Sequence, residues 1–261
     1  MRILLLSGLI LLLSYVQAIA GPLEQRGYEI AVEADRRTNG FGDCVADMKM
    51  VLRNREKQES VRLMRSRLLE VKDDGDKSLT IFDTPPDVRE TALLTSSHKA
   101  GDDDQWLYLP ALRRVKRISS SNKSGSFMGS EFSYEDLGSR EVEKYSYRYL
   151  MDGEVDGKSC YMIELVPKDR ENSGYSRIVS WLDQKEYRPL KEEYYDQKNR
   201  LLKTLKLEDY RIYLGFLWRA HHLKMMNHHN GRETELFFSN LRFGTGLTDD
   251  DFSRTSLQQS R

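Results

Sequence analysis

Short runs of strand-forming residues, separated by turn dipeptides, occupy most of the chain between residues 44 and 243. Asp152-Gly153, Asp156-Gly157 and Asn230-Gly231 are turn dipeptides of the hairpin type. We expect about eleven strands, with no fixed-period repeat and no Pro/Gly-rich linker that would divide the chain. So large a sheet with so few helices cannot be covered by helices on both faces. It must curl into a barrel or fold into a sandwich.

One helix is expected, at residues 22–38. Pro22 suits a first helical position, apolar and small residues recur at three- and four-residue spacing, and Asn39-Gly40 ends the pattern. Later strands such as the one containing Phe237-Phe238 put apolar groups on both faces, which fits a sheet curved around an interior. In the first strand, over residues 44–53, the apolar face is expected to carry Cys44, Ala46, Met48, Met50 and Leu52.

The N-terminus has the three-part layout of a secretory signal peptide. Met1-Arg2 is a short basic start, Ile3–Leu13 is an apolar run, and Ala18-Ile19-Ala20 offers small residues at the positions that a signal peptidase reads. The run is too short for a comfortable membrane span, and an uncleaved anchor is the alternative. We therefore expect a signal peptide at residues 1–20, cleavage after Ala20, and a single exported domain at residues 21–261.

Two cysteines are too few for a disulfide scaffold or for a zinc site of four thiolates. Export permits a disulfide between Cys44 and Cys160, and the alternative is two buried thiols. The spacing of the two residues does not decide between these states.

Charge and motif content exclude several classes of function. The 41 basic and 41 acidic residues give a formal net charge of zero, which removes the global electrostatic case for nucleic-acid binding. The sequence holds no phosphate-binding glycine pattern, no Gly-x-Ser-x-Gly elbow and no calcium-loop spacing, so no cofactor is expected. His98, near Asp102, Asp103 and Asp104, is the part of the sequence that most resembles part of a hydrolase triad. We expect no enzyme, with an exported hydrolase as a minor alternative.

Four histidines, His221, His222, His228 and His229, are the most obvious metal candidates. If Asn230-Gly231 closes a two-residue hairpin, all four lie on one strand and the two pairs stand about 20 Å apart, at roughly 3.3 Å per residue. One ion cannot bind both pairs. His228 would then face Glu233 across the hairpin. No metal site is expected.

Two further groups of residues are candidates for binding. A basic stretch, whose alternative interpretation is a solvated edge strand, is a candidate for an anionic headgroup or an acidic partner: Arg113, Arg114, Lys116 and Arg117. Methionine and aromatic side chains adapt to irregular apolar shapes, so a second group suits either a packed core or a ligand pocket. This candidate ligand-binding group contains Met48, Met50, Met64, Trp106, Tyr108, Phe127, Met128 and Phe132.

Three segments resemble those of the outer-membrane lipoprotein-sorting protein family, relatives of the LolA/LolB lipoprotein carriers. The segments are Ala46–Asn54, Asp104–Ile118 with its Trp-Leu-Tyr-Leu-Pro run, and Ser124–Asp136 with its Ser-Gly-Ser-Phe-Met-Gly-Ser run. The resemblance covers residues 24–252. It implies a mainly β (α+β) fold, an unclosed antiparallel half-barrel around a hydrophobic concavity with a helical lid. The lid-locking arginine of the better-known carriers maps onto no position here.

The resemblance implies a periplasmic carrier that holds a lipid or the acyl chains of a lipoprotein during transfer toward the outer membrane. The helix at residues 22–38 and the loop bearing Phe127, Met128 and Phe132 are the candidate covers. Members of this branch often accompany exporters of the resistance–nodulation–division class in the inner membrane. The alternative function is therefore a non-carrying accessory subunit of such an exporter.

Overall fold

A computed structural model describes residues 21–259 of the protein, and the expected signal peptide lies outside them. The described chain contains one long helix, α1 (Pro22–Arg36), and thirteen strands. The strands are β1 (Asp43–Arg53), β2 (Glu59–Leu69), β3 (Lys77–Thr84), β4 (Ala92–Ser96), β5 (Asp104–Leu109), β6 (Arg114–Ile118), β7 (Tyr145–Val155), β8 (Lys158–Pro167), β9 (Arg177–Asp183), β10 (Pro189–Tyr195), β11 (Leu201–Tyr213), β12 (Leu217–Asn227) and β13 (Glu233–Phe243).

Short helices complete the described elements. The chain ends in α2 (Arg254–Gln259), and five 3-10 helices lie in the connections. These are η1 (Pro110–Leu112), η2 (Ser120–Asn122), η3 (Tyr134–Leu137), η4 (Val142–Lys144) and η5 (Asp249–Phe252).

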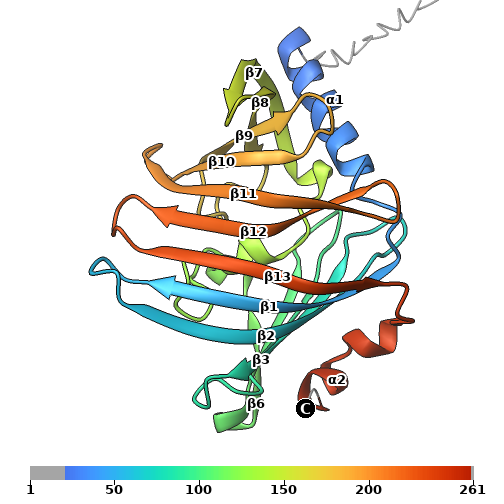
Figure 1. Ribbon diagram of the computed structural model, residues 1–261, viewed down its shortest axis with the longest axis vertical. Helices are drawn as coiled ribbons and strands as arrows, with labels where there is room; N and C mark the ends of the chain where they lie inside the picture. The colour runs from blue at the N-terminus through green and yellow to red at the C-terminus, as the bar shows by residue number, and fades with distance from the viewer. Residues whose placement is uncertain (1–20, 260–261) are drawn as a thin grey trace, which may run out of the picture.

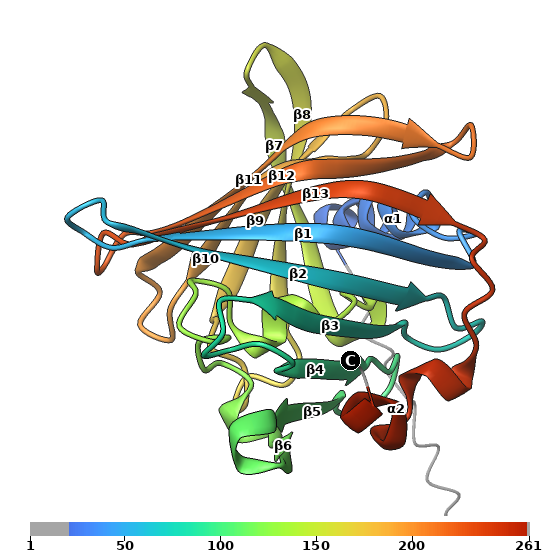
Figure 2. The ribbon, with the colours of Figure 1, turned by 60° about the horizontal axis from the view of Figure 1, so that its bottom comes forward.

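All thirteen strands form one antiparallel sheet in the order β6-β5-β4-β3-β2-β1-β13-β12-β11-β10-β9-β8-β7. Its two edges, β6 and β7, do not pair with each other, so the sheet is an unclosed half-barrel (Figures 1 and 2). The predicted mainly β, unclosed antiparallel architecture is confirmed. The predicted number of about eleven strands is slightly too low, since the sheet has thirteen.

The concave face of the sheet carries the main core, and the convex face of β3–β5 carries a second one. On β1 the predicted alternation is confirmed in the core, where Met48, Met50 and Leu52 pack into the concave side. The second core is covered by the C-terminal segment, which contributes Phe252 and Leu257. This outer cover accounts for apolar residues on the convex face of β3–β5, whereas Phe237 of β13 stacks on His222 with ring centroids 4.5 Å apart.

The expected helix is confirmed as α1, which starts with Pro22 as predicted and ends two residues early. It packs along β7 through the buried residues Gly27, Ile30 and Ala31. Gly27 permits this close approach, since a Cβ there would lie 2.5 Å from the Tyr149 nitrogen and 2.6 Å from the Arg148 carbonyl carbon. Arg26 crosses over the Tyr149 ring at 3.7 Å from its centroid and strengthens the same contact.

Gly27→Ala is expected to displace α1 from β7. Alanine is a better helix former than glycine by about 1 kcal/mol, so propensity alone would stabilise the variant. Backbone atoms cannot yield to the added methyl group, and we expect the clash to outweigh the propensity gain. Hydrogen exchange in α1 should become at least about tenfold faster, which corresponds to about 1.4 kcal/mol of lost packing. The exposed Gln25→Ala is the control, and unchanged exchange in Gly27→Ala would contradict this packing.

The two cysteines are free thiols that lie in different apolar clusters. Cys160 packs with Val179 and Trp181, while Cys44 packs with Phe41 and Leu217. Of the two alternatives left open by the sequence, the structure therefore has the pair of buried thiols. Between residues 21 and 259, no helix has the length and hydropathy needed to cross a bilayer.

Candidate functional site

A cavity of about 1230 Å³ lies between the concave face of the sheet and α1. This volume exceeds the roughly 300–1,000 Å³ of typical small-ligand sites. In Figure 2, α1 is seen behind β12 and β13, inside the curve of the sheet. The C-terminal half of α1 and the residues after it form one wall, which includes Ala31, Ala34 and Asp35. Apolar side chains on the sheet wall include Ile163, Leu165, Leu182, Leu207, Leu223 and Phe238.

The cavity occupies only one end of the half-barrel. Along a single strand, the inner-face residues change from lining the cavity to packing in the core, and this change marks its boundary. Along β1, Cys44 and Ala46 line the cavity, whereas Met48 and Met50 are buried in packed core. Along β12 the boundary falls between Leu223, which lines the cavity, and Met225, which is fully buried. The concave side is thus open near α1 and solid at the other end.

A loop across the concave face closes the solid end. Phe127 is 1% exposed, and its ring lies 5.6 Å from that of Phe82. The loop is fixed by polar contacts to the β12–β13 end: the Glu131 amide donates to Thr234 Oγ1 at 3.0 Å, and Asn227 Nδ2 donates to Glu131 at 2.7 Å. This segment, one of the two candidate covers, is part of the core.

The structure brings six of the eight predicted ligand residues together, but none of the eight lines the cavity. The six form the packed floor at its inner end: Met48, Met50, Met64, Phe127, Met128 and Phe132. Trp106 and Tyr108 lie on the opposite face of the sheet, in the cluster covered by Phe252 and Leu257. Adjacent positions on β5 alternate between the two faces, and both faces are apolar. The sequence pattern therefore did not show which face of β5 is concave.

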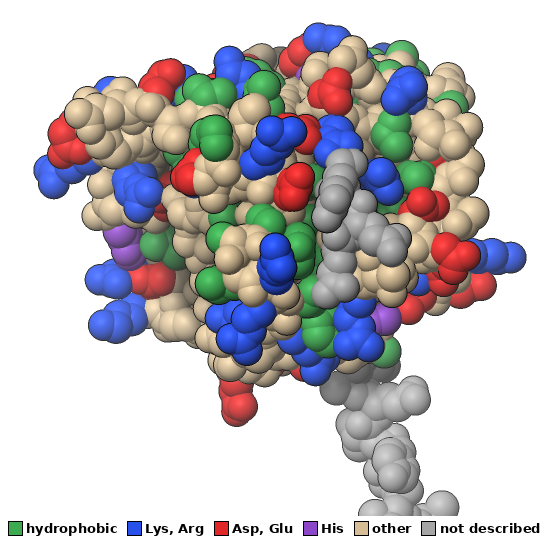
Figure 3. All heavy atoms as spheres, turned by 90° about the horizontal axis from the view of Figure 1, so that it is seen from below, with side chains coloured by type: hydrophobic (Ala, Val, Ile, Leu, Met, Phe, Trp, Pro, Cys, Tyr) green, Lys and Arg blue, Asp and Glu red, His purple; other side chains and the backbone are tan. Residues whose placement is uncertain are grey.

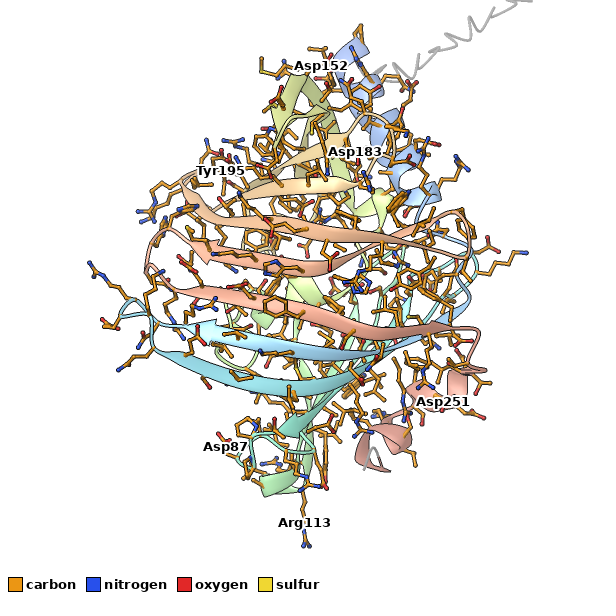
Figure 4. The ribbon with its side chains drawn as sticks, in the orientation of Figure 1. Asp87, Arg113, Asp152, Asp183, Tyr195 and Asp251 are labelled. Atoms are coloured by element: carbon orange, nitrogen blue, oxygen red, sulfur yellow. The ribbon has the colours of Figure 1, made fainter. Side chains whose placement is uncertain are left out.

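The basic stretch consists of Arg113, in the turn before the edge strand β6, and of residues in β6 itself. The structure places it at the end of the molecule far from α1, where Arg113 points away from the ribbon (Figure 4). Arg117 pairs with Asp104 at 2.7 Å, and positive and negative side chains are interspersed on the face seen in Figure 3. The predicted group shares this exposed strand edge and its preceding turn: Arg113, Arg114, Lys116 and Arg117.

A buried ion pair forms part of the cavity wall on the β9–β10 side. Arg140 binds Glu192, with Nη2 donating to Oε2 at 2.9 Å, and Glu192 also accepts from Tyr194 at 2.6 Å and from Ser180 at 3.1 Å. Burial would raise the pKa of Glu192, but the Arg140 charge and these hydrogen bonds together lower it. Glu193 lies on the opposite face and bonds Tyr195, as expected for adjacent strand residues.

Asp76 is a second charged group at the cavity, near its rim. Burial, with help from the charges of Glu141 and Glu70, raises the pKa of Asp76 to about 6. Arg219 acts in the opposite direction. Because the folded-state pKa lies above the ordinary value, folding favours the protonated carboxyl. The stabilising contribution of Asp76 is therefore present at low pH and is lost as the pH rises through about 6.

Asp76→Asn is expected to raise the free energy of unfolding at pH 7.5 by on the order of 1 kcal/mol, since the amide carries no charge to bury. The difference between variant and wild type should vanish near pH 4 and grow between pH 4 and 7. Urea unfolding across this range measures it. Asp73→Asn, at an exposed neighbouring position, is the control. A difference independent of pH would show that Asp76 ionisation does not affect stability.

A second cavity, of about 540 Å³, adjoins the first and shares Lys99, Ser139 and Arg140 with it. Glu135 lies in its wall and accepts hydrogen bonds from Gly174 and Ser173. Burial raises the pKa of Glu135 to about 7. Among the residues that line this smaller space, Lys123 pairs with Asp169 at 2.9 Å, and Lys144 pairs with Asp103.

The histidines do not form a metal site, and no cluster of ligands that could hold an ion occurs in the part of the chain described. The expected pairing of His228 with Glu233 is wrong, because Met226 pairs with Glu233 and residues 228–231 form a four-residue loop. His228 bonds Thr204 instead, at 2.7 Å. His221 bonds Tyr213 and the Phe238 carbonyl.

The candidate hydrolase residues form surface contacts. His98 Nδ1 lies 2.9 Å from Asp74, and its Nε2 lies 3.6 Å from Asp104. Hydrogen bonding to Asp74 is the main cause of the raised pKa of His98. No serine hydroxyl among the described residues forms a hydrogen bond to the His98 ring.

A family model described as "Uncharacterized protein" matches residues 74–259. A solved protein domain from Vibrio parahaemolyticus, described as outer membrane lipoprotein-sorting, is 54% identical, with a TM-score of 0.88 over 90% of this chain and 99% of that one. The chain belongs to the outer-membrane lipoprotein-sorting protein family. No match is found among curated proteins.

Other solved structures agree with this family assignment. A DUF1329 family protein from Desulfovibrio piger is 34% identical, with a TM-score of 0.85, and covers 90% of this chain and 99% of its own. A LolA superfamily protein from Nitrosomonas europaea is 22% identical, with a TM-score of 0.70 over 88% and 98% of the two chains. At that identity the similarity shows the fold alone. The family member described here thus has the fold of the LolA superfamily.

Sequence reasoning missed the charged residues of the cavity wall, Arg140, Glu192 and Arg219. For Arg219 a weak pattern exists, because it shares strand parity with Leu217, Leu223 and Met225, although also with His221. A charged residue on a mainly apolar face indicates a functional or paired charge. Arg140 lies in an irregular segment, where no periodicity points to its burial.

Proposed function

We propose that the protein is a periplasmic carrier that binds a lipid, or the acyl chains of a lipoprotein, in the hollow between α1 and the sheet. It would move this cargo toward the outer membrane. The observation that carries the proposal is the cavity of about 1230 Å³ with apolar side chains on its sheet wall. The similarity to a solved lipoprotein-sorting domain supports the same function.

The energetics of an acyl chain explain why such a hollow is needed. Burying a chain of sixteen methylenes gains about 13 kcal/mol gross, at about 0.8 kcal/mol per CH₂. An acyl chain exposed to water in the periplasm would lose this favourable free energy, so a carrier must hold the chain in a covered apolar site. The wall residues Leu165, Leu207 and Leu223 would contact the chain, and the methionine-rich floor would stop its end.

In this proposal α1 is the lid. It forms a wall of the cavity, and three of its large apolar side chains are exposed: Leu23, Tyr28 and Val32. Its two ends differ, since Pro22 begins it beside the expected cleavage site and Arg37 anchors the other end through Glu33 and the Lys185 carbonyl. Movement of α1 away from β7 would open the hollow.

The remaining expectations belong to the same proposal. A signal peptide at residues 1–20 would direct the single domain at residues 21–261 to the periplasm. Binding, with no catalysis, is the activity proposed. The basic edge strand containing Arg114, Lys116 and Arg117 would meet an anionic headgroup surface or an acidic partner.

Lipid transfer between vesicles tests the carrier function. Donor vesicles hold a pyrene-labelled phospholipid and a quencher, acceptor vesicles hold neither, and the purified protein is added at micromolar concentration. We expect transfer to increase in proportion to protein concentration. A transfer rate equal to that without protein would contradict the proposal.

The alternative function is that of an accessory subunit that docks on a resistance–nodulation–division type exporter in the inner membrane without carrying cargo. That function requires no vacant interior. The cavity favours the carrier, and co-purification with an exporter in the absence of any lipid binding would favour the accessory subunit.

A further inference from the structure

Arg219 differs from the other arginines of the cavity wall. Five arginines line the hollow: Arg36, Arg37, Arg140, Arg188 and Arg219. The first four each have a carboxylate partner: Arg36 and Arg37 bind Glu33 at 2.8 and 2.6 Å, Arg140 binds Glu192, and Arg188 binds Asp183 at 2.7 Å. Within residues 21–259, no carboxylate lies within ion-pair distance of the Arg219 guanidinium.

The contacts of Arg219 leave most of its donors available. Its Nη2 donates to the Thr38 carbonyl at a long 3.4 Å, and its guanidinium carbon lies 5.0 Å from the centroid of the Phe41 ring. Burial lowers the pKa of Arg219, with Asp76 and Glu70 opposing this at longer range. A guanidinium has five N–H donors in a planar fork that matches a carboxylate or a phosphate. Here one donor is used.

The position of Arg219 suits the polar end of an amphiphile. It contacts the segment that follows α1, while Leu223 lies further along the same strand toward the packed floor. A molecule with its head at Arg219 would therefore lay its chain along Leu223, Phe238 and Leu165. Nearby acidic groups, Asp76 and Glu70, would discourage a head of high negative charge.

We propose that Arg219 binds the head of the cargo, and that the cargo is an amphiphile whose head is a carboxylate or a phosphate. This inference rests on the proposed carrier function and names its ligand class. Burial in the cavity wall makes the charge-assisted bond stronger than one in water, because the local dielectric is low.

Displacement of bound cis-parinaric acid tests the inference, using competitors that share one chain and differ in the head. Palmitate, hexadecyl phosphate and the uncharged methyl palmitate are compared at pH 7.5. We expect wild type to bind at least one charged competitor at least about tenfold more tightly than methyl palmitate. Preference for palmitate identifies a fatty-acid type of head, and preference for hexadecyl phosphate identifies a phospholipid type.

Arg219→Gln should abolish this preference and leave methyl palmitate binding within about twofold of wild type. Arg219→Lys keeps the charge and should retain part of the preference, and the thermal midpoint of each variant reports whether it is folded. The exposed Arg211→Gln is the control and should behave as wild type. An undiminished preference in folded Arg219→Gln, or no preference in wild type that binds methyl palmitate, would overturn the role of Arg219. If wild type binds none of these probes, the carrier function itself fails.

Discussion

Ala46→Trp is expected to reduce the affinity for a C16 amphiphile by at least about tenfold, which is about 1.4 kcal/mol of binding free energy. Ala46 lies on the concave face of β1, where its side chain lines the cavity at the boundary with the packed floor. An indole group there would occupy the path of the acyl chain. Isothermal titration with palmitate or fluorescence displacement measures the loss.

Two further variants make this test specific. Ser66 pairs directly with Ala46 across β1 and β2 and also lines the cavity, so Ser66→Trp should reduce affinity in the same way. Lys49 lies on the convex face of β1, and Lys49→Trp should bind as wild type. Wild-type affinity in both folded cavity variants would show that the amphiphile binds elsewhere.

Glu192→Ala is expected to lower the free energy of unfolding by about 3–5 kcal/mol, because it leaves the Arg140 charge buried without a partner. Glu192 is 3% exposed and accepts hydrogen bonds from Arg140, Tyr194 and Ser180. The substitution removes the carboxylate that accepts hydrogen bonds from all three donors at once. Urea unfolding at pH 7 measures the change.

Glu193→Ala is the matched control, since Glu193 is the adjacent residue and faces the other side of the sheet. We expect it to cost less than about 1 kcal/mol. Replacing both partners, as in the double variant Arg140→Leu and Glu192→Leu, should cost less than Glu192→Ala alone, because no unpaired charge remains. A double variant less stable than Glu192→Ala would indicate that the pair itself contributes net stability.

Local patterns predicted the fold well where a residue's environment depends on its own strand. The alternation from Cys44 to Leu52 identified the concave face of β1, and Pro22 identified the start of α1. Hairpin dipeptides at Asp156-Gly157 and Asn230-Gly231 marked real turns, and both glycines have positive φ. These features follow from the period of a strand and from backbone sterics. The turn predicted at Asp152-Gly153 is wrong, because both residues lie within β7 and pair with β8.

Environments set by distant segments were not predictable in this way. Trp106 is a half-buried aromatic residue whose cover is supplied by Phe252 and Leu257, about 150 residues later in the chain. The His228 loop is four residues long because the Asn227 side chain accepts the His229 and Asn230 amides and donates to Glu131. A prediction based on the turn dipeptide alone does not include the contact between Asn227 and Glu131.

The sequence favoured an apolar hollow, but its candidate ligand residues lie in the packed floor and the outer core, outside the lining of the cavity. The cavity wall combines leucines with ionic groups from the irregular segment near Arg140 and from the β12 strand of Arg219. Which end of a half-barrel stays open depends on how far the loop containing Phe127 reaches across it, and this is a tertiary property.

The central claim is that the hollow beside α1 holds the chain of an amphiphile. Native mass spectrometry of the protein purified from the cells that produce it, without detergent, tests it most directly, with extraction and identification of any bound molecule. The account predicts one bound amphiphile per chain in wild type and its loss in Ala46→Trp. An empty wild-type protein that also fails to take up palmitate or phospholipid would contradict it.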